Sequence, residues 1–236
     1  PCLSCIYPHV NEIVLVDTGS TDDTKAIARD MGDKVKVYDF EWCDDFSAAR
    51  NFANSKATQP WLFTLDADEL VSGWESLRLR FYQAHRVITR NYTYDTLYAG
   101  CTENKGEHPA FERGYRWFPS GKIRLWPNDQ RIQFHYPVHE VVDESVYHLG
   151  MEVLVASPLI THHYGYIADN HAERRGEFYF KLLQKQLDSG VNPERTLEQM
   201  ATQAQGLRRF GEARRRWNDL LRLNPKRAGA HYNIGH

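Results

Sequence analysis

The feature that most constrains this fold is an alternation of short aliphatic segments with helical patterns over the first hundred residues. Residues 12–17 and 61–65 contain consecutive apolar side chains flanked by polar ones, the pattern of a buried strand. A shorter alternating strand is predicted at residues 35–38, and helical spacing covers residues 20–32 and 46–57. Strands that alternate with helices predict an α/β fold, in which a parallel sheet is covered by helices.

Two finer expectations concern where helices begin. Ser20 is followed three residues later by Asp23, which resembles a capping box and predicts a helix that starts at Ser20. A further helix is predicted from about Gly73 to His85.

Residues 87–164 are rich in aromatic side chains, spread through short segments with Gly and Pro between them. This pattern of aromatic residues separated by Gly and Pro predicts strands and loops. Packing within the core and the sheet explains such aromatic residues; a platform that stacks a sugar ring or a base is the alternative.

The chain is predicted to be helical from about residue 169 to its end. One helix is expected at residues 173–187, and small and large apolar residues then follow the 34-residue spacing of a tetratricopeptide repeat. The predicted core positions of that repeat are Leu197, Met200, Ala201, Ala204, Phe210, Ala213, Trp217, Leu220 and Pro225. A second repeat starts at Ala228.

We therefore divide the chain into an α/β domain at residues 1–168, a connecting helix at residues 169–193, and one complete and one partial repeat at residues 194–236. One and a half repeats cannot bury their own faces, so we expect the protein to continue beyond residue 236. The repeats also suggest a protein partner.

Composition excludes several classes of protein. The 236 residues are 42% hydrophobic and 25% charged, as in globular proteins. No apolar run approaches the ~18 residues that a membrane span needs, so no transmembrane segment is predicted. A net charge of −2 gives no case for binding nucleic acid. The four cysteines lack the second ligand-spaced pair of a zinc ribbon, which favours reduced thiols and a cytoplasmic location.

Acidic residues follow two of the predicted strands, at residues 17–23 and 66–69. Ligands of parallel sheets bind where the strands end. Asp66 and Asp68 are two residues apart, so both carboxylates can face one ligand. Hard oxygen ligands of this kind suit Mg²⁺ or Mn²⁺ and leave positions for phosphate oxygens. A solvated loop is the alternative.

Three segments together resemble family 2 glycosyltransferases with the GT-A fold: residues 12–22 (EIVLVDTGSTD), 45–53 (DFSAARNFA) and 65–69 (LDADE). They occur in the order of that family and at about its spacing. Further segments are similar to a subgroup that includes lipopolysaccharide-core glucosyltransferases, sublancin-type peptide S-glycosyltransferases and repeat-bearing bacterial homologues: RLWPN at 124–128, VHE at 138–140 and HHYGY at 162–166. The resemblance runs from residue 1 to about 190.

The resemblance implies a Rossmann-like GT-A domain that transfers a sugar with inversion from a nucleotide-diphosphate donor, UDP-linked, to a glycan, lipid or peptide acceptor. It also implies Mn²⁺ or Mg²⁺ as cofactor, and a cytoplasmic location that extends to a peripheral position at the inner membrane face. Residues 1–3 resemble the helix that follows the family's first strand. We therefore expect that strand to precede residue 1.

By the same resemblance, the nucleotide-sugar donor is bound by Asp17, Thr18, Ser20, Arg50 and Asp66. Asp17 would hydrogen-bond the base or ribose, and Asp66 would hold the ribose. Arg50 would reach the diphosphate or orient Asp66, since a guanidinium suits both. The alternatives are that Asp17 caps its turn and that Arg50 forms a surface ion pair.

The remaining roles concern the metal and the base. Asp68 and His163 are predicted metal ligands, with His162 as the alternative histidine. Inverting transfer needs a carboxylate that takes the acceptor's proton. The resemblance implies Glu140 as this catalytic base, because the VHE segment is the later acidic motif that the subgroup shares.

Asp143 and Glu144 are the alternatives for the base. Each of these candidates also has an ordinary structural interpretation, as a surface acid or a packed histidine.

Two other functions fit parts of the sequence. A non-catalytic repeat scaffold could carry a relic GT-A domain, but the intact Asp-Ala-Asp argues against loss of function. A sugar-phosphate nucleotidylyltransferase can share this sheet, but the Ala-Arg-Asn segment at residues 49–51 and its spacing to Asp66 favour a transferase.

Overall fold

A computed structural model of the chain describes residues 1–95, 100–167 and 172–235. The chain forms two compact units. The first comprises Pro1–Cys43, Ser47–His135 and Glu140–Asp169, and the second comprises Asp44–Phe46, Tyr136–His139 and Asn170–His236. The predicted boundary at residues 168–169 lies outside the described residues, and the predicted division into domains stays a prediction.

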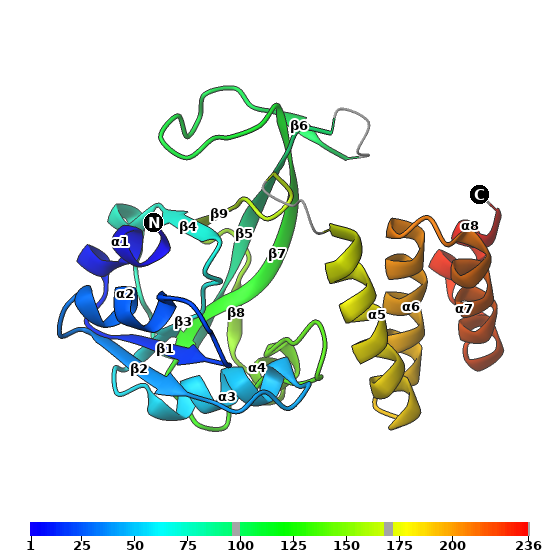
Figure 1. Cartoon of the computed structure of the whole chain (residues 1–236), viewed down its shortest axis with the longest axis horizontal. Helices are drawn as coiled ribbons and strands as arrows, with labels where there is room; N and C mark the ends of the chain where they lie inside the picture. Colours follow the sequence, from blue (N-terminus) through cyan, green and yellow to red (C-terminus); the bar gives the residue numbers. More distant parts are fainter. Residues whose placement is uncertain (96–99, 168–171, 236) are drawn as a thin grey trace. The chain divides into compact units, whose positions relative to one another are not determined.

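In the first unit, short helices alternate with the strands of two sheets (Figure 1). Its elements are α1 (Cys2–Ile6), η1 (Tyr7–His9), β1 (Ile13–Asp17), α2 (Thr24–Asp30), β2 (Val35–Asp39), α3 (Phe46–Lys56), β3 (Trp61–Phe63), β4 (Glu69–Ser72), η2 (Trp74–Ser76), β5 (Gln83–Thr93), β6 (Thr102–Glu103), β7 (Arg116–Pro127), α4 (Asp143–His148), β8 (Glu152–Leu154) and β9 (Ile160–His163). The first residue of α3 belongs to the second unit.

β1 and β2 form a parallel pair, in register from Ile13 opposite Val35 to Asp17 opposite Asp39. The strands predicted from these aliphatic segments are therefore present. The predicted helix start at Ser20 is wrong, because α2 begins at Thr24. The Asp17 carboxylate accepts the backbone N–H of Ser20, which keeps that residue in the turn.

The larger sheet is mixed, with the strand order β3-β7-β5-β9-β4, while β6 pairs with β7 and β8 with β5. β5 runs parallel to β8 and β9, whereas the β3–β7, β5–β7 and β4–β9 pairs are antiparallel. A single parallel sheet was therefore the wrong expectation. Among the described residues, β3 lies in a different sheet from β1 and pairs antiparallel with the returning strand β7.

The helix predicted from Gly73 to His85 is also wrong. Only one 3-10 turn forms there, and β5 begins at Gln83. Gly73 has a φ of 92°, and a Cβ at this position would lie 2.0 Å from the carbonyl oxygen of Pro158. The chain therefore turns tightly at Gly73 before it enters the sheet.

The aromatic-rich region contains strands joined by loops, as predicted, together with the short helix α4. β5 and β7 form a long antiparallel ribbon (Figure 1), in which Tyr92 lies opposite Trp117. Tyr92 and Trp126 are fully buried, which supports the packing interpretation. Tyr94 and Tyr115 are exposed and pack edge to face, with ring centroids 5.2 Å apart.

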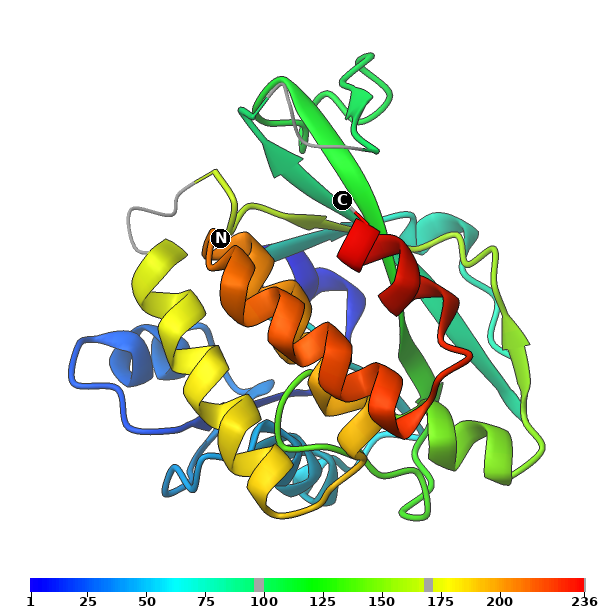
Figure 2. The same ribbon diagram turned by 90° about the vertical axis from the view of Figure 1, so that its right-hand side faces the viewer.

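Helices dominate the second unit: α5 (Ala172–Asp188), α6 (Pro193–Gly206), α7 (Phe210–Leu223) and α8 (Ala228–Gly235). Figure 2 shows these yellow, orange and red helices side by side. Most of the predicted repeat positions are buried, with Leu197, Ala201, Trp217 and Leu220 in one cluster. Phe210, the first residue of α7, is 67% exposed, and Pro225 is exposed too, so the prediction of these two as core residues is wrong.

Two short segments of the chain pack with these helices. The backbone N–H of Phe46 donates to the carbonyl of Pro137, and that of Val138 donates to the buried side chain of Gln186. No helix among the described residues is long and apolar enough to cross a membrane.

Candidate active site

Asp17 ends β1 and is almost fully buried. Its Oδ1 accepts the backbone N–H groups of Ser20 at 2.9 Å and of Gly19 at 3.0 Å. Hydrogen bonds from Ser20 are the main cause that lowers the pKa of Asp17; burial opposes them, and Gly19 and Lys25 add to them. Asp17 therefore caps its turn as a carboxylate, and Thr18 and Ser20 lie exposed on that turn.

Arg50 joins two acidic residues that are far apart in the sequence. Its Nη2 donates to Asp66 Oδ1 at 2.5 Å, its Nε donates to Glu140 Oε1, and its guanidinium lies 5.5 Å from the ring centroid of Phe134. The Arg50 side chain is only 25% exposed and that of Glu140 only 8%. Arg50, a predicted donor ligand, therefore brings together Asp66 of the Asp-Ala-Asp segment and Glu140, the predicted base. We call these three residues the charged constellation.

The charges of this constellation support one another. Burial alone would lower the pKa of Arg50 and raise that of Asp66. The carboxylates of Asp66 and Glu140 outweigh burial and raise the pKa of Arg50, while Arg50 and Arg124 hold the pKa of Asp66 well below its usual range. Asp66 is therefore ionised at neutral pH.

Asn51 explains why Arg50 points toward these carboxylates. Its side-chain amide donates to the carbonyl of Phe134 at 3.0 Å, and its oxygen accepts the Phe134 N–H at 2.7 Å. These two bonds fix α3 against the segment at Phe134, so the preceding side chain projects toward Glu140. The Ala-Arg-Asn segment therefore contains one functional residue and one anchor.

A buried ion pair shapes the loop that carries the aspartates. Arg124 donates to both carboxylate oxygens of Glu69, at 2.6 and 2.8 Å, and Glu69 accepts the backbone N–H of Asp66 at 2.9 Å. Burial raises the pKa of Glu69, and Arg124 opposes that rise. Sequence reasoning assigned no role to either residue, although Arg124 belongs to the RLWPN segment.

Asp68 and His163 lie next to each other. His163 Nε2 is 3.1 Å from Asp68 Oδ2, and the Asp68 side chain is 49% exposed. The pairing of β4 with β9 produces this contact, because Glu69 lies opposite His163.

His162 points to the other face of the strand and is fully buried, between Ser72 Oγ and Tyr92 Oη. Burial, with His108 and Arg90 nearby, lowers the pKa of His162 to about 3, so it is a neutral structural residue.

Gly165 leaves the space that a cation between Asp68 and His163 would need. A Cβ at residue 165 would lie 2.6 Å from His163 Nε2 and 2.9 Å from Asp68 Oδ2. One imidazole nitrogen and one carboxylate oxygen suit a divalent cation such as Mn²⁺. The described residues contain no group of three or more His, Cys, Asp or Glu side chains arranged to hold a metal. These two side chains therefore fit a divalent cation as two of its ligands.

The three candidate bases occupy different positions. Glu140 lines a narrow crevice together with Arg50, Lys122 and Asp143. Asp143 pairs with Arg86 at 2.7 Å, and Glu144 is exposed near the start of α4. Of the three, Glu140 is the one that Arg50 links to Asp66.

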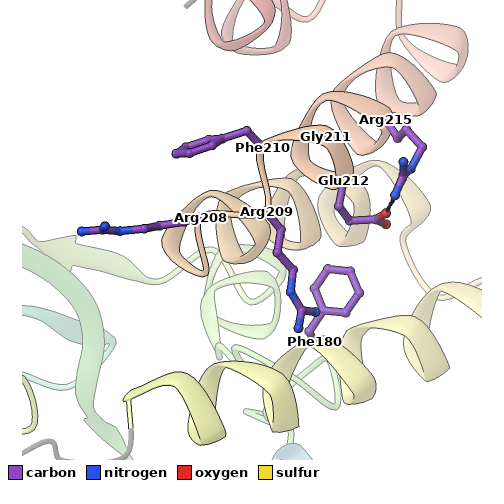
Figure 3. A pocket seen from close by; sticks show the side chains of 7 residues that line it. All are labelled: Phe180, Arg208, Arg209, Phe210, Gly211, Glu212 and Arg215. Atoms are coloured by element: carbon purple, nitrogen blue, oxygen red, sulfur yellow. Dashed lines mark hydrogen bonds and ion pairs between the residues drawn. The ribbon is translucent and has the colours of Figure 1, made fainter.

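A larger, open depression lies on the helical unit. Figure 3 shows the side chains that line it: Phe180, Arg208, Arg209, Phe210, Gly211, Glu212 and Arg215. Arg209 pairs with Glu177, and Arg215 pairs with Glu212. Because two of its three arginines are already paired with carboxylates, we assign this depression no part in the chemistry.

Comparison with known proteins identifies the family. Residues 7–125 match the model of the family described as glycosyl transferase family 2. The chain belongs to this family. The matched residues of this family 2 glycosyltransferase include Arg50, Asp66 and Asp68, and the match confirms the predicted fold class.

Two of three similar proteins carry names that agree with this assignment, and the third is named for its repeats. A TPR repeat-containing protein of Synechococcus elongatus is 34% identical over 180 residues, covering 73% of this chain and 40% of that protein. The SPbeta prophage-derived glycosyltransferase SunS of Bacillus subtilis is 28% identical over 153 residues, covering 63% and 36%. The lipopolysaccharide core biosynthesis glycosyltransferase LpsC of Rhizobium meliloti is 39% identical over 61 residues, covering 25% and 22%. The chain thus matches less than half the length of each relative.

Proposed function

We propose that this family 2 glycosyltransferase transfers a sugar, with inversion and with the help of a divalent cation, from a UDP-linked donor to a glycan, lipid or peptide acceptor. The observation that carries the proposal is Arg50, which joins Asp66 and Glu140 in one charged constellation. Family membership and the names of the relatives support the reaction class.

The donor would bind along the ends of β1 and β3. Asp17 holds its turn rigid, so that Thr18 and Ser20 are presented beside the base and ribose. Asp66 is ionised and accepts hydrogen bonds from the ribose. The donor's diphosphate competes with the two carboxylates for the Arg50 guanidinium, whose fork suits phosphate oxygens.

Asp68 and His163 would hold Mn²⁺ or Mg²⁺. When bound, the cation neutralises charge on the leaving diphosphate, help worth several kcal/mol in general. Gly165 keeps the space beside both side chains open.

Glu140 would act on the acceptor. Its carboxylate takes the proton of the acceptor's hydroxyl or thiol as that atom attacks the anomeric carbon, on the face opposite the diphosphate. The bond between the anomeric carbon and the diphosphate oxygen breaks, and the nucleotide diphosphate leaves with the electron pair. One displacement of this kind inverts the anomeric centre.

Release of nucleotide diphosphate tests the reaction class. The protein is incubated with a panel of UDP- and GDP-sugars and either Mn²⁺ or Mg²⁺, and the released diphosphate is measured. We expect release from a UDP-sugar that depends on the cation and falls sharply in Asp66→Asn. Asp129→Asn is the matched control, since Asp129 pairs with Arg131 outside the constellation. Equal release from Asp66→Asn and the wild-type protein would refute the assignment.

The repeat region and the location complete the proposal. The helical unit would bind a protein partner, as tetratricopeptide repeats do by stacking into a concave surface. A cytoplasmic location, including a peripheral position at the inner membrane face, stays a prediction from the cysteine usage and the resemblance.

A further inference from the structure

A row of side chains crosses four neighbouring strands beside the candidate cation site. Glu69 on β4 lies opposite His163 on β9, which lies opposite Asn91 on β5, which lies opposite Phe118 on β7. Residues directly opposite each other on paired strands project to the same face of a sheet. The register therefore brings Asn91 to the ring of His163, at a position to which sequence reasoning gave no role.

The hydrogen bonds of Asn91 fix which way its amide points. The residue is buried, and its Nδ2 donates to the carbonyl of Phe118 at 3.1 Å and to Ser120 Oγ at 3.0 Å. A backbone carbonyl can only accept a hydrogen bond, so the nitrogen must face Phe118. The amide oxygen then faces His163 Nδ1, at 2.9 Å.

The orientation of Asn91 decides where His163 carries its proton. A neutral imidazole has one N–H group, and an amide oxygen can only accept, so Nδ1 is the protonated nitrogen. The other nitrogen, Nε2, faces Asp68 Oδ2, which is also an acceptor. Two acceptor atoms side by side repel unless a proton or a metal ion lies between them. Gly165 leaves the space beside both.

We propose that Asn91 is a positioning residue for the cation site, because it holds the proton of His163 on Nδ1 and so presents Nε2 as a free ligand beside Asp68. This inference rests on the proposed function, which assigns the cation to Asp68 and His163. Partners that hold the second nitrogen of a ligating histidine in this way typically change metal affinity 10–100-fold when they are mutated.

The tautomer is tested without any metal. Long-range ¹H–¹⁵N NMR spectra of the cation-free protein, labelled with ¹⁵N-histidine, identify which ring nitrogen of His163 carries the proton; the variant His163→Gln assigns the signals. The spectrum is taken at a pH where the ring is neutral. We expect the Nδ1–H form in the wild-type protein and a shift toward Nε2–H in Asn91→Leu. An Nε2–H tautomer in the wild-type protein would overturn the proposal.

The affinity is tested with Mn²⁺ alone, from the electron paramagnetic resonance signal of the free ion. Asn91→Leu should weaken binding about 10–100-fold. Asn91→Asp keeps an acceptor oxygen toward Nδ1, but its second oxygen cannot donate to the Phe118 carbonyl. It should keep the wild-type tautomer and bind Mn²⁺ more tightly than Asn91→Leu. Ser120→Ala removes a partner of the amide nitrogen only and should bind Mn²⁺ within about twofold of wild type, well below the 10–100-fold loss expected without the oxygen.

The outcomes separate this inference from the proposed function. Unchanged Mn²⁺ affinity in Asn91→Leu, equal weakening in the Asp and Leu variants, or no Mn²⁺ binding by the wild-type protein would overturn the inference. If Asn91→Leu does not fold, the wild-type tautomer and Asn91→Asp still decide. Correct tautomer and affinity results, with no release of nucleotide diphosphate from any donor, would refute the proposed reaction and leave the role of Asn91 standing.

Discussion

Removing Arg50 should destabilise the first unit, because it leaves two carboxylates close together without their shared cation. Breaking a buried ion pair on one side costs about 3–5 kcal/mol. The Glu140 side chain is only 8% exposed, but that of Asp66 is 37% exposed, so water offsets part of the loss at Asp66. We therefore expect Arg50→Met to lower the free energy of unfolding by about 3 kcal/mol at pH 7, the lower end of that range.

Urea unfolding followed by tryptophan fluorescence measures this loss. Of the six tryptophans, Trp217 alone lies in the helical unit, so a Trp217→Phe background makes the signal specific to the first unit. The double variant Arg50→Met with Glu140→Gln is the matched control. It removes the charge that Arg50→Met strands, so it should recover a large part of the lost stability.

The stability difference between the wild-type protein and Arg50→Met should depend on pH. In the wild-type protein Arg50 holds the pKa of Asp66 below its unfolded value, so this stabilisation is present above that value and is lost as pH falls. In Arg50→Met, Asp66 keeps its burial but loses the Arg50 charge that lowers its pKa, so this part of the stabilisation is missing. The difference between the two proteins should therefore persist from pH 7 to about pH 5 and shrink as the pH falls further, below the unfolded pKa of an aspartate, ~3.9. A difference that keeps its size down to about pH 2, or one below about 1 kcal/mol at pH 7, would refute the reasoning.

Three further predictions concern single side chains. Gly165→Ala should abolish most Mn²⁺ binding while the protein still folds, because its Cβ would lie 2.6 Å from His163 Nε2. Gly211→Ala is the control, since a Cβ there meets nothing within 4 Å. Equal Mn²⁺ affinity of the two variants would contradict the proposed cation site. Asp68→Asn should remove most cation-dependent binding of UDP, measured by calorimetry with Mn²⁺, with little change in stability because the side chain is half exposed; unchanged affinity would refute the assignment. Burial lowers the pKa of His162 to about 3, so the folded protein loses stability as the pH falls from about 6.5 to 3 and the unfolded histidine gains its proton. His162→Phe should therefore make the free energy of unfolding depend less on pH over this range. Urea unfolding that shows the same pH dependence in the variant and the wild-type protein would contradict this.

The local parts of this fold could be predicted from the sequence. The aliphatic segments of β1, β2 and β3 form strands where they were predicted, and the spacing of small and large residues predicted the helices of the second unit. The helix predicted after Gly73 is wrong because the structure of this segment depends on a strand that is distant in the sequence. β5 is a strand since it pairs with β7, about thirty residues later, and no local pattern shows that pairing.

In the candidate site, too, some features could be predicted from the sequence and others could not. Arg50, Asp66 and Asp68 stand in recognisable short segments, so sequence reasoning could name them. Their contacts with Glu140 and His163, and the pairing of Glu69 with Arg124, arise from strand register and from the docking of α3 by Asn51. The role of Asn91 had no sequence signal, because an isolated asparagine in a strand acquires its function only from the residue opposite.

Glu140→Gln tests the central claim most directly. The measurement compares two quantities in the wild-type protein, in Glu140→Gln and in the control Asp143→Asn: the affinity for the UDP-sugar with Mn²⁺, and the rate at which UDP is released. The substitution keeps the shape of the side chain but removes the proton acceptor. We predict donor affinity near the wild-type value and a release rate lower by at least about 100-fold in Glu140→Gln. With a thiol acceptor the loss should shrink at high pH, where the thiolate forms unaided. A wild-type release rate in Glu140→Gln, with a large loss in Asp143→Asn instead, would contradict the account and move the base to Asp143.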